Sequence, residues 1–286
     1  MAGYETLRTT SFDGLSLHVR LYGDPADPRL PVICLPGLTR NSADFEDLAL
    51  YLSAAGRRVI SPDFRGRGRS AYDPEFMNYQ PPTYARDTID LLAGLGIARA
   101  FFVGTSLGGI VTQIVALGAP ALVAGAVLND IGPELDPAGL ARIATYAGKQ
   151  SDPATWDEAV AQLRMINLSQ FPELDDATWM KFARAVFTEK PEGGLRPDYD
   201  PRIGDAMRAG GPPVDMWPLF AGLAAVPTLV LRGALSDLLA PATVEKMTAA
   251  KPDLVAVEVP ARGHAPLLDE PVSLAAIDAH LARVES

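Results

Sequence analysis

The sequence of 286 residues is poor in the side chains that usually form cross-links or bind metals, with one cysteine and three histidines. Cys34 alone cannot close an internal disulfide, which fits a reducing, cytoplasmic compartment. A chain of this length buries about 75% of its unfolded surface and can fold without such a cross-link. Neither a zinc-type nor a calcium-type ligand spacing occurs. We therefore expect no metal ion and no disulfide.

Positive charge is also scarce, with 25 basic against 35 acidic residues and a net charge of −10. This balance repels nucleic acid and anionic membrane surfaces. The N-terminal segment, residues 1–8, lacks the apolar region of a secretory signal. The apolar stretch from Ile110 to Leu128 approaches the roughly 20 residues of a membrane span, but Pro120 would break the helix. We interpret it as a buried helix, a turn and a buried strand. A small-molecule partner is expected, and a homodimer is left open.

Short apolar runs rich in β-branched residues predict strands that are covered on both faces. A hairpin at 6–12 and 15–21, turning at Asp13-Gly14, is followed by runs at 31–35, 58–61, 100–104, 123–129, 226–232 and 254–259. Helical patterns lie between these runs, at 84–95, from Pro241 onward, and at 271–284. This alternation predicts an α/β fold with a mostly parallel sheet.

Residues 132–216, called the insert from here on, interrupt the alternation. Helix-start signatures occur at Asp136-Pro137, at Asp152-Pro153 and at 176–178, and no convincing strand is visible. After the third signature, apolar residues recur at the spacing of a helix face. We predict a helical domain at 132–216 that is inserted into a core domain formed by residues 1–131 and 217–286.

The strongest chemical signal is the segment Gly104-Thr105-Ser106-Leu107-Gly108. It matches the G-x-S-x-G turn that presents a nucleophilic serine, and it has the required strand before it and helix after it. A side chain at Gly104 or Gly108 would collide with neighbouring backbone in so tight a turn. Ser106 is therefore the candidate nucleophile.

A serine hydroxyl needs a positioned base, and His264 is the best candidate among the three histidines. His18 lies in the early hairpin, and His280 lies in the final helix, where a surface or packing role is expected. His264 lies in a loop after the last strand run, and loops at the carboxyl ends of strands build α/β active sites.

The third member should be a carboxylate that orients the imidazole and stabilises its cation. Asp237 follows the strand run 226–232, and Asp130 follows the run 123–129. We favour Asp237, with Asp130 as the alternative. The chain order is then Ser106, Asp237, His264, which is the order of an α/β-hydrolase triad.

An acyl-transfer site also needs donors for the oxyanion. The backbone N–H of Leu107, directly after the nucleophile, is one candidate, and that of Leu38, in the loop after an early strand, is the other. Arg40 beside this loop and Trp217 at the exit of the insert are candidate substrate contacts.

Together these features resemble the α/β-hydrolase fold superfamily over nearly the whole chain. The segment 63–70 looks like the family's D-x-R-G-x-G-x-S turn, and 263–271 looks like its catalytic-histidine loop. Pro36-Gly37 departs from the usual His-Gly. The resemblance implies an eight-stranded, mostly parallel core flanked by helices, with a helical cap inserted after the sixth strand, where 132–216 lies.

The function expected from these residues is a serine hydrolase that acts on carboxylic esters of small to medium molecules. A lactonase, or a hydrolase of carbon–carbon bonds in vinylogous diketones, would use the same triad. A receptor built on a hydrolase scaffold is the alternative from another class, and the intact triad argues against it. A dehalogenase or epoxide hydrolase needs a carboxylate where Ser106 stands. No cofactor is expected, because the loose match Gly66-x-Gly68-x-x-Ala71 to a dinucleotide loop does not directly follow its strand.

Overall fold

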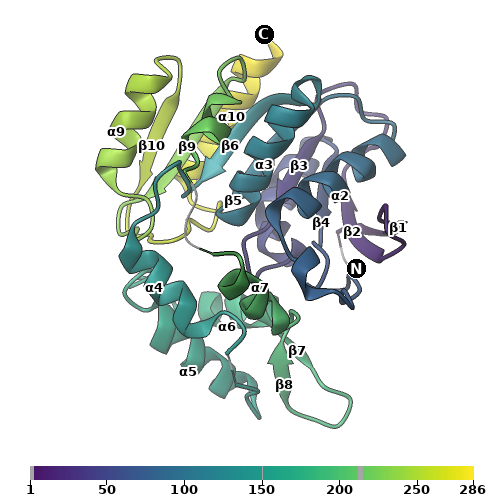
Figure 1. Cartoon of the computed structure of the whole chain (residues 1–286), viewed down its shortest axis with the longest axis vertical. Helices are drawn as coiled ribbons and strands as arrows, with labels where there is room; N and C mark the ends of the chain where they lie inside the picture. The colour runs from purple at the N-terminus through teal and green to yellow at the C-terminus, as the bar shows by residue number, and fades with distance from the viewer. Residues whose placement is uncertain (1–2, 150, 212–214) are drawn as a thin grey trace.

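The computed structural model describes residues 3–149, 151–211 and 215–286. Its main sheet has eight strands in the order β1-β2-β4-β3-β5-β6-β9-β10 (Figure 1). The strands are β1 (Glu5–Thr10), β2 (Ser16–Tyr22), β3 (Val32–Leu35), β4 (Val59–Pro62), β5 (Ala100–Thr105), β6 (Val123–Asn129), β9 (Thr228–Gly233) and β10 (Val255–Val259). β2 pairs antiparallel with β1 and β4, and all other neighbours are parallel. The predicted eight-stranded, mostly parallel sheet is confirmed.

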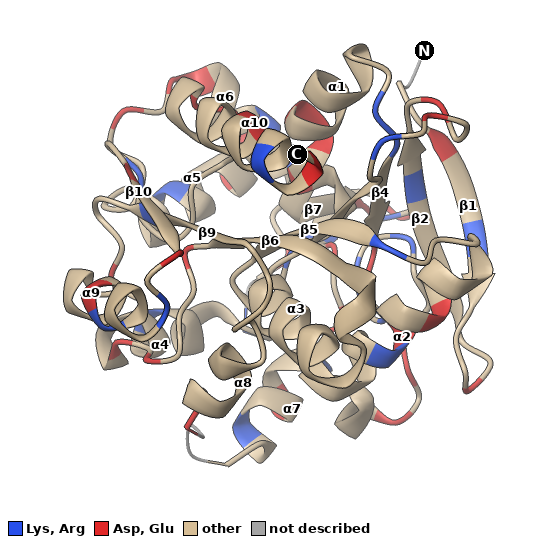
Figure 2. Cartoon of the chain, turned by 90° about the horizontal axis from the view of Figure 1, so that it is seen from above, with Lys and Arg blue, Asp and Glu red and all other residues tan. Residues whose placement is uncertain are grey.

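Helices cover both faces of this sheet (Figure 2). One face carries α1 (Glu46–Ala54) and α10 (Pro271–Glu285). The other carries α2 (Pro81–Gly94), α3 (Leu107–Gly118), α8 (Trp217–Ala221) and α9 (Pro241–Ala250). Three short 3₁₀ turns, η1 (Ser42–Phe45), η2 (Phe76–Asn78) and η3 (Pro120–Leu122), complete the core. Apolar side chains on both faces of the strands explain the continuous apolar runs.

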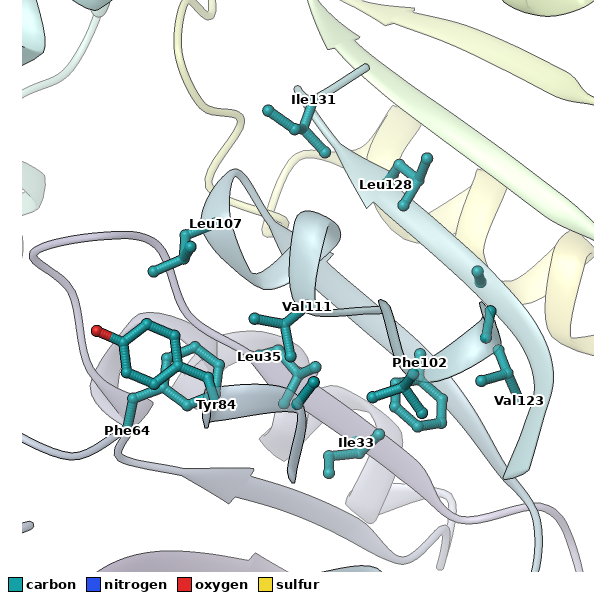
Figure 3. Packing of buried hydrophobic residues seen from close by; sticks show 14 of the residues in the cluster. Ile33, Leu35, Phe64, Tyr84, Phe102, Leu107, Val111, Val123, Leu128 and Ile131 are labelled. Atoms are coloured by element: carbon teal, nitrogen blue, oxygen red, sulfur yellow. The ribbon is translucent and has the colours of Figure 1, made fainter. Parts of the chain in front are cut away.

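The larger hydrophobic cluster lies between the sheet and α3. Ile33, Leu35 and Phe102 of the strands and Val111 of the helix are fully buried there (Figure 3). Burying a side chain of this size contributes about 1.5–3 kcal/mol. This packing fixes α3 against β3 and β5, and so fixes the turn that joins β5 to α3.

The apolar stretch 110–128 has the structure expected for it. It comprises most of α3, then η3, in which Pro120 is the first residue, and then β6. None of the helices in the described ranges is long and apolar enough to span a bilayer.

In its described residues, 132–149, 151–211 and 215–216, the insert folds into four helices and a small hairpin, grouped at one end of the molecule (Figure 1). Its elements are α4 (Pro137–Tyr146), α5 (Trp156–Asn167), α6 (Asp176–Val186), β7 (Phe187–Glu189), β8 (Leu195–Pro197) and α7 (Arg202–Ala209). The antiparallel pair β7–β8 was not expected from sequence. The helix expected from Asp152-Pro153 begins later, at Trp156 after the cap Thr155, because the Pro153 carbonyl accepts a bond from the N–H of Leu195 (2.8 Å). Trp179 and Phe171 are buried in a cluster that belongs largely to the insert.

Asn41 connects the core to the insert. Its Oδ1 caps η1 at the N–H of Ala43, while its Nδ2 donates to the Ala185 carbonyl (3.0 Å) and to Asp198 Oδ2 (2.9 Å). Burial, together with the nearby Asp63 carboxylate, raises the pKa of Asp198 to about 6. The ionised form of this carboxylate is therefore disfavoured in the folded protein.

Because the pKa of Asp198 is raised on folding, the native state binds more protons than the unfolded state between about pH 4 and 6, and stability falls as pH rises through that window. Near pH 8, the raised pKa of Asp198 lowers the free energy of unfolding by roughly 3 kcal/mol. We predict that Asp198→Asn, which keeps an acceptor for Asn41, raises the free energy of unfolding at pH 8 and changes it little below pH 4. Denaturant unfolding at both pH values tests this.

Asp205→Asn, at an exposed insert carboxylate, is the control and should leave stability nearly unchanged at both values. Equal or lower stability of Asp198→Asn at pH 8 would contradict the prediction.

Candidate active site

Ser106 lies in the turn between β5 and α3 with φ 51° and ψ −114°. The turn is as tight as predicted, because a Cβ on Gly104 would lie 2.4 Å from the Gly108 carbonyl oxygen. A Cβ on Gly108 would lie 2.0 Å from the carbonyl oxygen of Leu35. The Ser106 N–H donates to the Asn129 carbonyl of β6 (3.0 Å). The turn is therefore held between two neighbouring strands, β3 and β6.

His264 is the histidine that meets the serine. Its Nε2 lies 2.9 Å from Ser106 Oγ, and its side chain is 8% exposed. His18 is buried against Asp63, and His280 contacts the Pro227 carbonyl, so both have structural surroundings. The predicted juxtaposition of Ser106 and His264 is present.

The carboxylate on the other side of the imidazole belongs to Asp130, at the end of β6. Asp130 Oδ2 lies 2.8 Å from His264 Nδ1. The same carboxylate, fully buried, accepts bonds from the Gly233 N–H (2.8 Å) and from Ser236 Oγ (2.5 Å). These donors hold the carboxylate in one orientation. With Nδ1 protonated towards Asp130, Nε2 is free to accept the serine proton.

The expectation that Asp237 orients His264 is wrong. Asp237 instead forms a two-pronged ion pair with Arg142 of α4, at 2.6 Å from Nε and 2.9 Å from Nη2. Burial raises the pKa of Asp237, but the bonds and charge of Arg142 outweigh it and hold this pKa below its usual range. Asp237 is thus ion-paired with Arg142 of the insert, whereas the neighbouring Ser236 donates a hydrogen bond to Asp130. The alternative named from sequence, Asp130, has the geometry of the third member.

A cavity of about 380 Å³ opens over Ser106 and His264. Both the core and the insert line this cavity. The core contributes Gly37, Leu38 and Pro266. Helices α4, α5 and α6 of the insert contribute Ile143, Tyr146, Leu163, Ile166, Asn167, Lys181 and Phe182. This volume lies within the range of small-molecule sites. Among the described residues, no group of three or more histidine, cysteine or acidic side chains is arranged to hold a metal ion.

Of the two predicted substrate contacts, Arg40 lines this cavity and Trp217 does not. Arg40 stacks on the Phe182 ring at 4.3 Å and donates from Nε and Nη2 to Asp44 (2.7 and 2.5 Å). Trp217 packs beside the core cluster, and its Nε1 donates to Glu134 (3.1 Å). The substrate-contact prediction for Trp217 is therefore wrong, because α8 carries the residue to the flank of α3.

Leu38 and Leu107 both lie close to the nucleophile in the structure. Leu107 is the first residue of α3, and the Leu38 loop is so close that a Cβ on Gly37 would lie 3.9 Å from Ser106 Cβ. Arg67, fully buried, donates from Nε (2.9 Å) and Nη2 (2.8 Å) to the Leu38 carbonyl. This holds the peptide plane after Leu38, a role of the 63–70 turn that was not inferred from sequence.

Two further core residues that sequence reasoning missed hold the loop around His264. Asn129 Nδ2 donates to the Pro266 carbonyl (2.9 Å). The Glu270 carboxylate accepts the N–H groups of Leu267 (2.8 Å) and Leu268 (3.0 Å). Asn129 lies directly before Asp130, and this adjacency was the sequence signal for a functional strand end.

The chain matches known proteins of one hydrolase family. The model of the alpha/beta hydrolase family matches residues 32–277. The chain is 35% identical over 265 residues to a 3-hydroxybutyrate-oligomer hydrolase of Cupriavidus necator, covering 89% of this chain and 88% of that protein. It is 29% identical over 228 residues to a 2-(acetamidomethylene)succinate hydrolase of Mesorhizobium japonicum, covering 80% and 79%.

A solved alpha/beta hydrolase of Novosphingobium aromaticivorans superposes with a TM-score of 0.93 at 47% identity, covering 99% of both chains. The chain belongs to the alpha/beta hydrolase family, and the prediction of an α/β-hydrolase enzyme is confirmed.

The geometry predicts which aspartate matters for turnover. Asp130→Asn should lower kcat for a p-nitrophenyl ester by about 10⁴, because the amide favours the wrong imidazole tautomer. Asp237→Asn is the matched control, made on the neighbouring strand end, and should cost less than about tenfold because Asp237 does not touch the imidazole. Steady-state kinetics on both variants, with circular dichroism to verify folding, test this. The reverse ranking, or equal losses, would contradict the assignment.

Proposed function

We propose that this hydrolase is a serine esterase that cleaves carboxylic esters of small to medium molecules through a covalent acyl-enzyme. The observation that carries the proposal is the continuous hydrogen-bonded chain from Asp130 through His264 to Ser106, the last two of which line the cavity. Nucleophile, base and orienting carboxylate stand in the order that this chemistry needs.

In the proposed acylation step, Ser106 Oγ attacks the ester carbonyl while His264 Nε2 takes the serine proton. The Oγ–C bond forms, and the carbonyl electrons move to oxygen. The backbone N–H groups of Leu38 and Leu107 are proposed to stabilise this oxyanion. When the tetrahedral intermediate collapses, the C–O bond to the alcohol breaks, and His264 returns the proton to the leaving alkoxide.

Deacylation repeats the sequence with water in place of serine. His264 takes a proton from water, the hydroxide adds to the acyl carbon, and the Ser106 ester bond breaks as the proton returns to Oγ. Asp130 stabilises the imidazolium in both halves of the reaction. The net result is one ester and one water converted to an acid and an alcohol.

The insert is proposed to act as the cap domain of this site, with residues 1–131 and 217–286 as the core domain. Side chains of α4, α5 and α6 face Ser106 across the cavity. Such a cover excludes bulk water and strengthens the electrostatic interactions inside.

We further propose that the substrate is an ester of a hydroxy acid that retains a free carboxylate. The relative from Cupriavidus necator is named for 3-hydroxybutyrate oligomers, whose chains end in a carboxylate. Arg40 is the proposed contact for that group. Asp44 occupies its Nε and Nη2, and Nη1 forms no hydrogen bond within the described part of the chain.

The function is tested by a panel of a 3-hydroxybutyrate dimer, p-nitrophenyl butyrate, a small lactone and a vinylogous diketone. We expect turnover of the two esters, with loss of at least about 10³-fold in Ser106→Ala, since the nucleophile forms the covalent intermediate. Turnover of only the lactone or only the diketone would replace the ester assignment with that reaction. Wild-type turnover by Ser106→Ala would refute the mechanism, and failure of the whole panel would favour a receptor.

The Arg40 contact is tested with the dimer and its neutral methyl ester. Arg40→Met should raise KM for the dimer about tenfold or more, because a charge-assisted bond is lost. KM for the methyl ester should stay within about twofold, since it carries no carboxylate. Arg184→Met, which removes another cation lining the cavity, is the control. Equal changes for both esters would contradict the contact.

A further inference from the structure

The backbone of His264 is held by a residue of the insert. Gln170, in the connection between α5 and α6, accepts the His264 N–H on its side-chain Oε1 (2.9 Å). Its backbone carbonyl accepts the N–H of the preceding residue, Gly263 (2.7 Å). Gln170 is 5% exposed, so both bonds lie away from competing water.

The contact between these segments is too close for any side chain at position 263. A Cβ on Gly263 would lie 2.1 Å from Gln170 Oε1 and 2.8 Å from Gln170 Cβ. Leu267, further along the same loop, packs against the cluster that contains Phe171 and Trp179. The histidine loop therefore packs into the insert as well as onto the core.

The anchors of this loop divide between the two parts of the chain. Asn129 and Glu270 hold its later residues, Pro266 to Leu268, from the core. Gln170 holds the residues at the base itself, 263 and 264, from the insert. The position of the imidazole thus depends on an element that the sheet does not position directly.

We propose that Gln170 is a positioning residue for His264, so that the base is aligned with Ser106 only while the insert is docked on the core. This rests on the proposed esterase function and adds a coupling between cap and base. Without Gln170 Oε1, the buried His264 N–H would lack its hydrogen-bond acceptor, and the histidine loop would shift to satisfy it. A displacement of about 1 Å in a reacting group can cost 10²-fold in rate.

The test compares Gln170→Leu, which removes the acceptor, with Gln170→Glu, which keeps an oxygen at Oε1. With p-nitrophenyl butyrate, Gln170→Leu should lower kcat about tenfold to hundredfold while KM changes less than about threefold, because alignment and not binding is lost. Gln170→Glu should recover most of kcat. Arg196→Met is the control, because it removes another contact between insert and core, to Tyr72 Oη (3.2 Å), far from the histidine loop in sequence. It should leave kcat within about twofold.

A second measurement approaches the same contact from the other side. Gly263→Ala forces a methyl group against Gln170, and its loss in kcat should be non-additive with that of Gln170→Leu, since both disrupt one contact. Gly263→Ala leaves the Gln170 side chain itself unchanged. If Gln170→Leu fails to fold, Gly263→Ala alone tests the contact: kcat should fall while KM changes less than about threefold, and wild-type kcat would contradict the positioning role.

Three results would overturn the positioning role: wild-type kcat in Gln170→Leu, equal losses in the Leu and Glu variants, or strict additivity with Gly263→Ala. Failure of the esterase function itself is distinguished beforehand, by an inactive wild type or an active Ser106→Ala.

Discussion

The arrangement around Ser106 depends on one buried carboxylate. Asp130 has no exposure, and its two oxygens accept bonds from the end of β9, from the loop after β9, and from the imidazole of the loop after β10. A buried charge is tolerated only when it is fully hydrogen-bonded. The requirement to satisfy this one charge draws three strand ends together, and His264 reaches Ser106 because of it.

Most other charges near the site are neutralised in pairs. Arg40 pairs with Asp44, and Arg142 pairs with Asp237. Arg65, with no exposure, is held among three carboxylates in the turn that precedes Arg67. Each pairing orients a side chain and weakens its field, so few charged atoms near the site lack a partner within the described part of the chain. Arg40 Nη1, which forms no hydrogen bond among the described residues, therefore supports the proposed substrate class.

Besides lining the cavity, the insert forms hydrogen bonds that hold residues of the active site in place. It binds Asp237 through Arg142 and the His264 backbone through Gln170, and it binds Asn41, next to the Leu38 loop, through Asp198. Bonds of this kind link the closing of a cover to the geometry beneath it. In the proposed mechanism, excluding water and aligning the base are consequences of the same docking.

Local signals were sufficient for much of the site. Ser106 was predictable because Gly104 and Gly108 are required by contacts made within one turn and with the adjacent β3. The strands were predictable from apolar runs, because parallel strands are buried on both faces. The pair β7–β8 was not predictable from these local signals. The start of α5 was not predictable either, because a hydrogen bond between Pro153 and Leu195, which are far apart in the chain, decides it.

By itself, the sequence determined the α/β alternation, the nucleophile turn and the one histidine placed to serve it, since each follows from residues close in the chain. Only the tertiary structure decided between Asp130 and Asp237. Both follow neighbouring strands whose carboxyl ends meet at one edge, so spacing alone cannot rank them. The choice was made by Arg142, 95 residues before Asp237, which pairs with one carboxylate and leaves the other to His264. The contact of Gln170 with His264, 94 residues later, was not predictable from the sequence for the same reason. It forms through the docking of the insert on the core and follows no local pattern.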